Sequence, residues 1–237
     1  MPAKEDKSTR ALDEATIVRA ALRVMRRHGA DKLSMRSLAR ELNVSPMALY
    51  HHVPSKSVLL DRMRDTVLAR IELPEPSAQH WQAQLRDIAI ASIDELSKYP
   101  GLLAPTGGGA LTPGVRAMMA HLMAVLTTAG FEPREAALAL TTYQTQLGGL
   151  VLQRSMQRAK AGRSRKVKSK GAAAEVGEEL RGLSFQEALE FGVDVVLEGL
   201  RVRLERQQGA QDSAERAAEG AGRSPGGRGK SGVDKRN

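Results

Sequence analysis

The stretch LSMRSLARELNVSPMALYHHVPSKSVLL, residues 33–60, decides the fold of this chain. Its first part predicts a helix that is capped by Ser34. Three apolar residues share one face of this helix because they lie three to four positions apart, namely Leu38, Ala39 and Leu42. Asn43 then tolerates the left-handed backbone conformation with which many helices end. The pattern therefore predicts a short helix followed by a tight turn.

A second short helix follows this turn. Ser45 is its cap and Pro46 its first residue, where the missing N–H of proline costs nothing. We expect it to end at His52, with Leu49 pointing inward and Val44 just ahead of it. Small or hydrogen-bonding residues remain on its outer face: Ser45, Met47, Ala48, Tyr50, His51 and His52. Two helices with such an outer face are typical of the helix-turn-helix that enters the major groove of DNA.

The segment ALYHHVPSKSVLLD, residues 48–61, resembles the signature of the TetR-type (tetracycline-repressor-like) transcriptional regulators. In that family an aromatic-rich recognition helix is followed by a loop with a lysine and then by Leu-Leu in a linking helix. The resemblance extends from Ile17 to about Ile71. It rests on spaced identities at Gly29, Leu38, Ala39, Leu42, Val44, Leu49, Tyr50, His52, Lys56, Leu59 and Leu60. The resemblance implies an all-α fold. In this fold a three-helix DNA-binding domain is joined by a linking helix to a helical ligand-binding and dimerisation domain.

The resemblance also implies which residues contact DNA. The resemblance places six residues at base edges or at nearby DNA backbone: Met35, Arg36, Ser45, Pro46, Met47 and Ala48. Tyr50, His52 and Lys56 match positions that hold phosphates, and His51 completes the exposed set. The chemistry agrees, because a hydroxyl, an imidazole and an ammonium all donate hydrogen bonds to phosphate oxygens. Arg36 can pair with guanine through two hydrogen bonds. An alternative for Tyr50 is packing among the helices with only its hydroxyl outside.

Charge is unevenly spread along the 237 residues, whose net charge is +9. Residues 1–73 carry 14 Lys and Arg against 9 Asp and Glu, as expected for a domain that binds phosphate. Residues 154–170 carry eight basic residues and no acidic one. We interpret this second run as a solvated loop. The alternative is a segment that adds non-specific affinity for DNA.

Composition excludes several other classes of protein. Only 3% of the residues are aromatic, so the core must consist of Leu, Val, Ala, Met and Ile, a mixture that favours helices. The absence of cysteine excludes disulfides and cysteine-ligated zinc. No apolar run approaches the roughly 20 residues that span a bilayer, and residues 1–10 lack the apolar core of a signal peptide. We therefore expect a cytoplasmic protein without a membrane partner.

Helical periodicity and chain breakers predict the division into domains. Residues 1–10 are expected to be a disordered basic arm, and residues 11–72 the DNA-binding domain with its linking helix. Prolines within 73–77 mark a boundary. Residues 78–206 form the helical ligand-binding and dimerisation domain, in which residues 158–182 are a mobile basic loop. Residues 207–237 are expected to be a disordered tail.

The second domain offers no spacing that supports catalysis or a phosphate loop, so we predict neither an enzyme nor a cofactor. His51 and His52 are unsuited to sharing a metal ion, because neighbours on a helix point about 100° apart, and we predict no metal site. The family resemblance implies a ligand pocket here. Its candidate lining is apolar with a few polar groups: Trp81, Leu102, Leu103, Met118, His121, Leu122, Tyr143, Gln146 and Leu147. Ordinary core packing is the alternative for each of these residues.

Two long helices, expected at residues 131–158 and 184–206, resemble the pair that forms a four-helix dimer interface in the family. The second has apolar residues on two faces and therefore needs two partners. Two recognition helices related by a two-fold axis would contact an inverted repeat with half-sites about one helical turn apart.

These observations predict a homodimeric regulator that binds an inverted-repeat operator in double-stranded DNA. We expect a repressor that is released by a small-molecule effector. Three alternatives stay open at this stage: an architectural DNA-binding protein without an effector, an enzyme with a vestigial DNA-binding domain, and an activator of the same family.

Overall fold

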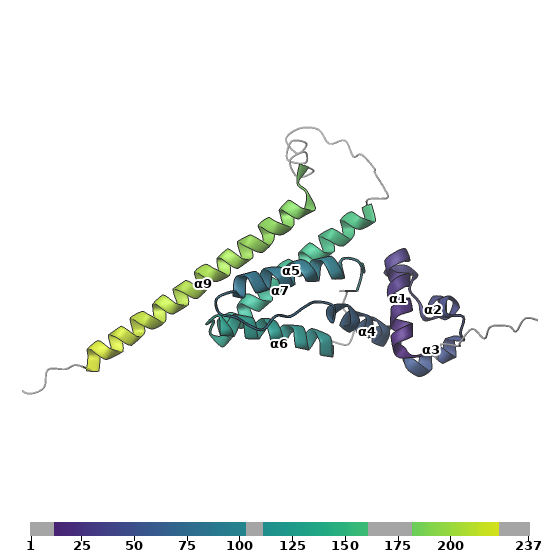
Figure 1. Cartoon of the computed structure of the whole chain (residues 1–237), viewed down its shortest axis with the longest axis horizontal. Helices are drawn as coiled ribbons and strands as arrows, with labels where there is room; N and C mark the ends of the chain where they lie inside the picture. Colours follow the sequence, from purple (N-terminus) through teal and green to yellow (C-terminus); the bar gives the residue numbers. More distant parts are fainter. Residues whose placement is uncertain (1–11, 103–110, 161–181, 223–237) are drawn as a thin grey trace, which may run out of the picture. The chain divides into compact units, whose positions relative to one another are not determined.

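The computed structural model describes residues 12–102, 111–160 and 182–222, and every regular element in these ranges is a helix (Figure 1). The predicted all-α fold is confirmed. Residues up to Glu198 belong to one compact unit, and the chain from Gly199 onward belongs to a second. The compact units therefore do not divide at residues 73–77, where the sequence predicts a domain boundary.

The first helices of the chain follow its local capping signals closely. They are α1 (Glu14–His28), a 3-10 turn (Ala30–Lys32), α2 (Met35–Leu42), α3 (Pro46–His52) and α4 (Lys56–Leu68). Ser34, Ser45 and Ser55 each accept a hydrogen bond from the backbone N–H three residues later, at 3.0–3.1 Å. Asn43 has φ 54° and ψ 43°, the left-handed conformation that the sequence predicts between α2 and α3.

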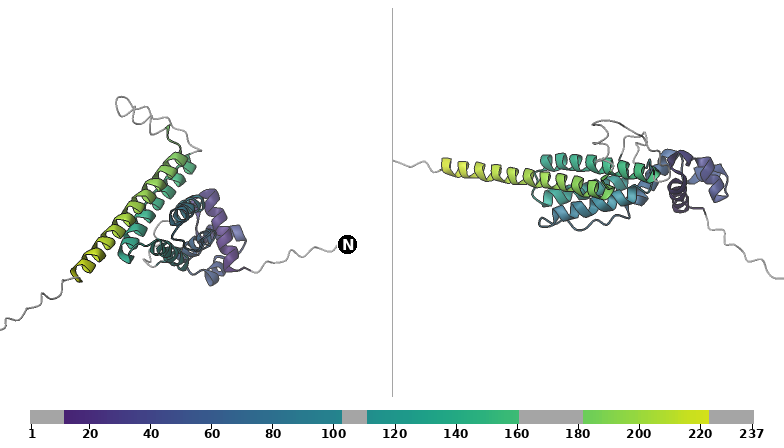
Figure 2. Two further views of the ribbon diagram at one scale, coloured as in Figure 1. Left: turned by 60° about the vertical axis from the view of Figure 1, so that its left-hand side comes forward. Right: turned by 90° about the horizontal axis from the view of Figure 1, so that it is seen from above.

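Three further helices pack on one another behind α4: α5 (Trp81–Leu96), α6 (Pro113–Thr128) and α7 (Pro133–Lys160). Figure 2 shows α1–α3 together at one end of this unit, with α4 leading from them towards α5–α7. Leu85, Ile88 and Leu122 are buried in the core between these helices. Tyr143 of α7 donates a hydrogen bond of 2.6 Å to the carbonyl of Leu85 of α5, and burial raises the pKa of this phenol.

The last helix, α9, spans Phe185–Gly222. Its part in the first unit buries Phe185, Leu189, Val193 and Leu197. Arg86 of α5 pairs with Asp194 of α9, and the guanidinium of Arg154 of α7 lies 4.5 Å from the centre of the Phe185 ring. The start of α9 is thereby fixed against α5 and α7.

Three expected boundaries differ in the structure. The predicted tail begins at residue 207, yet α9 continues to Gly222, because residues 207–222 contain many good helix formers such as Ala, Gln, Glu and Arg. The linking helix α4 ends at Leu68, before residue 72, the predicted end of the domain that includes it. Helix α7 continues to Lys160, beyond the predicted start of the basic loop, whose residues 161–181 lie outside the described ranges. The predicted arm, residues 1–10, and residues 223–237 of the predicted tail also lie outside the described ranges.

Within the described ranges, none of the helices is both long and apolar enough to cross a membrane.

Candidate functional site

Helix α3 has one buried side and one open side. Leu49 is completely buried, whereas Met47 is 67% and Tyr50 45% exposed. His51 and His52, in the last turn, are exposed as well. A single leucine therefore anchors a helix of seven residues whose remaining side chains mostly face outward. The exposure of Tyr50 disfavours the alternative in which only its hydroxyl reaches the surface.

The start of α2 is held by a capping box. Ser34 accepts a hydrogen bond from the Ser37 backbone N–H, and the Ser37 hydroxyl accepts one from the Ser34 N–H at 2.9 Å. Arg36 is exposed beside this cap. Met35 is only 7% exposed because its side chain belongs to the core. The prediction that Met35 faces base edges is therefore wrong for its side chain in this structure, and only its backbone remains for contact.

Neighbouring elements fix the open side of α3. Val53 is completely buried directly after α3, and its N–H donates to the Leu49 carbonyl at 2.8 Å. Ser55 then caps α4, which leaves Lys56 exposed in the first turn. An ion pair of 3.0 Å between Glu14 and Arg62 joins α1 to α4. The exposed DNA-contact candidates of α2, α3 and the start of α4 are thus carried by helices that pack together as one group.

A cavity of about 300 Å³ lies among α4, α5, α6 and α7. Its lining is mostly apolar: Arg64, Leu68, Ile88, Ser92, Leu96, Val115, Met118, Met119, Leu122, Gln144, Leu147, Gly148 and Val151. The polar groups come from three different helices, namely Arg64 from α4, Ser92 from α5 and Gln144 from α7. Gln144 also contacts the sulfur of Met119 at 3.0 Å. A mostly apolar cavity with a few polar groups is typical of a small-molecule site.

Three of the predicted pocket residues lie on this cavity: Met118, Leu122 and Leu147. Leu103 lies outside the described ranges. Gln146 instead lines a separate hollow between α7 and α9.

The other predicted pocket residues have different environments, and the structure brings none of them to this cavity. Trp81 packs edge-on against Phe131, with ring centres 5.6 Å apart. Tyr143 bonds to the Leu85 carbonyl, as described above. The backbone carbonyl of the buried Leu102 accepts hydrogen bonds from Arg64. For His121, the Nε2 atom is buried, and the described part of the chain offers it no hydrogen-bond partner.

Sequence reasoning missed the contribution of α4 to the cavity, because that helix was assigned to the DNA-binding domain. Arg64 is one of the missed residues, and hydrogen bonds hold it to Leu102 and Asp61. Its Nε and Nη2 donate to the Leu102 carbonyl at 3.3 and 3.1 Å, and its Nη1 donates to Asp61 at 2.9 Å. A lone arginine between the buried Met63 and Val67 is the signal that could have revealed it.

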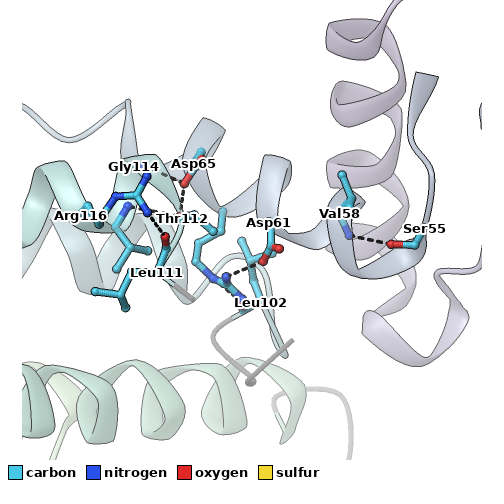
Figure 3. A network of polar contacts seen from close by, with 11 residues as sticks. Ser55, Val58, Asp61, Asp65, Leu102, Leu111, Thr112, Gly114 and Arg116 are labelled. Carbon is cyan, nitrogen blue, oxygen red and sulfur yellow. Dashed lines mark hydrogen bonds and ion pairs between the residues drawn. The ribbon is translucent and has the colours of Figure 1, made fainter. Parts of the chain in front are cut away.

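A second polar contact lies one residue further along α4 (Figure 3). The Asp65 carboxylate accepts hydrogen bonds from the Thr112 hydroxyl and, at 3.1 Å, from the Gly114 backbone N–H. Thr112 is itself the N-cap of α6. Helix α4 is therefore bonded both to the segment before α6 and to the first turn of α6.

Across the described ranges, no group of three or more His, Asp or Glu side chains could hold a metal ion.

Known proteins share sequence features and helix arrangement with this chain. Residues 17–63 match the family described as "Bacterial regulatory proteins, tetR family". An "HTH-type transcriptional regulator" of Saccharopolyspora erythraea is 33% identical over 135 residues, which cover 55% of this chain and 56% of that protein. A "Tetracycline repressor protein class G" of Vibrio anguillarum is 30% identical over 151 residues, covering 60% and 69%. The chain thus spans about half the length of the first relative and two thirds of the second.

Solved structures of known proteins have a similar fold. The crystal structure of apo ActR from Streptomyces coelicolor has a TM-score of 0.68 and 26% identity, and the match covers 83% of this chain and 98% of that one. A structure of ActR in complex with actinorhodin has a TM-score of 0.66 and 25% identity, over 81% and 98%. The fold and these matches place the chain in the class of helix-turn-helix transcriptional regulators. More particularly, the chain belongs to the TetR family.

Proposed function

We propose that this protein is a homodimeric repressor that binds an inverted-repeat operator and is released by a small-molecule effector. Residues 11–72 would form its DNA-binding domain and residues 78–206 its ligand-binding and dimerisation domain. The observation that carries the proposal is the combination of an open α3 with a cavity that α4 helps to line.

The outer surface of α3 supports DNA contact. Tyr50, His51, His52 and Lys56 are exposed and can donate hydrogen bonds to phosphates, which fix a protein on the duplex. Sequence-specific contacts would come from Arg36, Ser45, Pro46, Met47 and Ala48. Met47 and Ala48 offer only apolar contact, for instance with a thymine methyl group, so Arg36 is the main candidate for hydrogen bonding to a base.

Exposed apolar residues on α7 and α9 support dimerisation. Leu152 and Met156 of α7 are 62% and 49% exposed, and Phe191 and Val195 of α9 are 73% and 51% exposed. Leu189 and Val193 lie on the opposite side of α9 and are buried. Phe191 and Val195 belong to the second apolar face that the sequence predicts for this helix, and a second copy of the chain would cover them together with Leu152 and Met156.

The cavity supports an effector that is largely apolar and carries a few hydrogen-bonding groups. Binding would release DNA only if the effector had a higher affinity for a conformation that does not fit the operator. An effector with equal affinity for both conformations would shift nothing. Arg64 and Leu68 of α4 line the cavity, so an occupant contacts the helix that carries the DNA-binding helices.

Selection of bound sequences from random duplex DNA at near-physiological salt tests this proposal. We expect an inverted repeat to be enriched, and that duplex then serves in a screen for molecules that release it. Lys56→Ala should weaken binding to all sequences alike and lower the salt dependence by about one phosphate contact, while Arg134→Ala on α7 is the matched control. If no shared sequence were enriched and binding collapsed with salt, an architectural DNA-binding protein would be favoured instead.

A further inference from the structure

Asp65 is a charged residue of α4 that the proposed DNA and effector contacts do not use. Its carboxylate lies at the N-terminus of α6, where it accepts hydrogen bonds from the Thr112 hydroxyl and the Gly114 N–H (Figure 3). The first N–H groups of a helix have no partner within the helix, and a negative charge there is favourable. Asp65 lies on α4 and therefore caps a different helix, α6.

Gly114 makes this contact possible. A Cβ atom at this position would lie 2.6 Å from the Asp65 Oδ1 and 3.1 Å from the Asp65 Cα. The second of these atoms is backbone, so rotation of a side chain would not relieve the overlap. Gly114 lies in the first turn of α6 without a left-handed φ, and glycine is required there by the close approach of α4 rather than by backbone conformation.

Both partners of this contact are sequence neighbours of residues that line the cavity. Arg64 precedes Asp65 on α4, and Val115 follows Gly114 on α6. A molecule in the cavity would therefore lie against residues directly adjacent to both partners of the contact. The Asp65–Gly114 contact joins α4 to the first turn of α6 one residue away from the cavity lining on each helix.

We propose that the hydrogen bonds from Thr112 and Gly114 to Asp65 form a latch that positions the DNA-binding domain. With the latch closed, α4 holds α1–α3 in the orientation that fits the operator. An effector that separates α4 from the start of α6 breaks the latch and lets the orientation change. Asp65 is a positioning residue in this scheme and contacts neither DNA nor effector. The inference rests on the proposed function and adds the element through which the cavity acts on the DNA-binding domain.

Operator affinity without any effector tests the latch. The operator duplex obtained from the selection experiment is titrated with wild type, Asp65→Ala, Asp65→Asn and Gly114→Ala. We expect Asp65→Ala and Gly114→Ala to weaken operator binding about tenfold, which is typical of coupling between sites. Asp65→Asn keeps an oxygen that can accept both hydrogen bonds, so it should stay within about threefold of wild type. The double variant Asp65→Ala/Gly114→Ala should be no weaker than either single variant, because both remove the same contact.

Two controls separate a latch from a general loss of stability. Asp87→Asn removes an exposed carboxylate on α5, and Gly209→Ala changes a helical glycine that has open space around it. Both should bind the operator like wild type. Urea unfolding of each variant fixes the folded fraction, and affinities are compared per folded protein. The binding of non-operator DNA should stay unchanged in all latch variants.

Each outcome decides one point. If wild type binds the operator and the latch variants bind it equally well per folded protein, the latch is refuted while the proposed function stands. Strictly additive effects of Asp65→Ala and Gly114→Ala would also refute it, since the two residues would then act separately. If wild type itself selects no operator, the proposed function fails first, and the latch has no DNA-binding state to position.

Discussion

The helix-turn-helix and the cavity beneath α4 are formed in contrasting ways. The helix starts and the turn within residues 34–52 arise from neighbours a few positions away: serine caps, the left-handed Asn43, and a proline that starts α3. The residues that line the cavity lie on four helices and range from Arg64 to Val151 in the chain. Local signals thus build the proposed DNA-contacting surface, whereas long-range packing builds the proposed ligand site.

The difference has a functional consequence. A surface that depends on local signals keeps its shape when the rest of the molecule moves, as a DNA-contacting unit must. A cavity formed by several helices changes shape whenever one of them shifts, and α4 belongs to both regions. The following four predictions test this contrast.

The largest effect is expected from Leu49→Ala. Leu49 is completely buried and anchors α3, so its truncation should lower the free energy of unfolding by about 2–5 kcal/mol. Operator binding should be lost together with the position of α3. Urea unfolding and operator titration measure both quantities. Leu138→Ala, at a leucine that is 48% exposed, should change stability by less than about 0.5 kcal/mol. A stable Leu49→Ala variant with normal operator binding would show that α3 is held by something else.

Filling the cavity should affect the ligand site alone. Leu147→Trp places a larger side chain in the space lined by Leu122 and Gly148. We expect the effector concentration needed for half-maximal release to rise at least about tenfold, the result of losing about 1.4 kcal/mol of binding free energy. Operator affinity without effector should stay within about threefold of wild type. Leu138→Trp is the surface control. Unchanged release would mean that the effector binds elsewhere.

Asn43 tests how far the local turn determines the DNA-contacting unit. Its φ of 54° is unfavourable for most side chains, so Asn43→Ala should lower the free energy of unfolding by about 1 kcal/mol. Asn43→Gly should be nearly neutral because glycine adopts this conformation readily. Urea unfolding of both variants measures the difference. Equal stabilities would contradict a role for the left-handed turn.

The smallest effect concerns Glu187 at the start of α9. The Ser184 backbone N–H donates a hydrogen bond of 2.7 Å to its carboxylate and holds the pKa of this group below its ordinary value of 4.5. A lowered folded-state pKa means that the contribution is fully present above about pH 4.5 and is lost as the pH falls through the folded-state value. Glu187→Gln should therefore flatten the pH dependence of unfolding slightly below pH 4.5. Gln186→Glu adds a carboxylate next to this position and is the control for charge; an identical pH profile in Glu187→Gln and wild type would exclude the contribution.

Particular residues show how far the sequence could be interpreted. The caps at Ser34 and Ser45 and the span of α3 were predictable, since capping depends on residues within one helical turn. Met35 was misjudged, because burial depends on the direction in which α2 packs. The helical residues 207–222 were taken for a tail because the stretch 207–237 is rich in Gly, Arg and Ser, although many residues of 207–222 have good helix propensity.

The cavity residues show the complementary limit. Met118, Leu122 and Leu147 were predicted, since apolar residues on neighbouring helices converge in any bundle. Trp81 and Tyr143 look equally suited in sequence, yet one packs on Phe131 and the other bonds to Leu85. Arg64 and Ser92 were overlooked for the cavity, because their shared environment arises only when α4 packs against α5 and α6.

The sequence by itself determined the starts of α2 and α3, the left-handed turn between them, and the outer surface of α3, since each depends on interactions within one or two helical turns. Only the tertiary structure decided which side chains enclose the cavity, and why glycine occupies position 114. The glycine is required because Asp65 and Gly114, 49 positions apart, meet at hydrogen-bond distance, and the cavity forms where four helices pack together. The spacing of residues along a helix contains no information about such an encounter, because it follows from how whole helices pack.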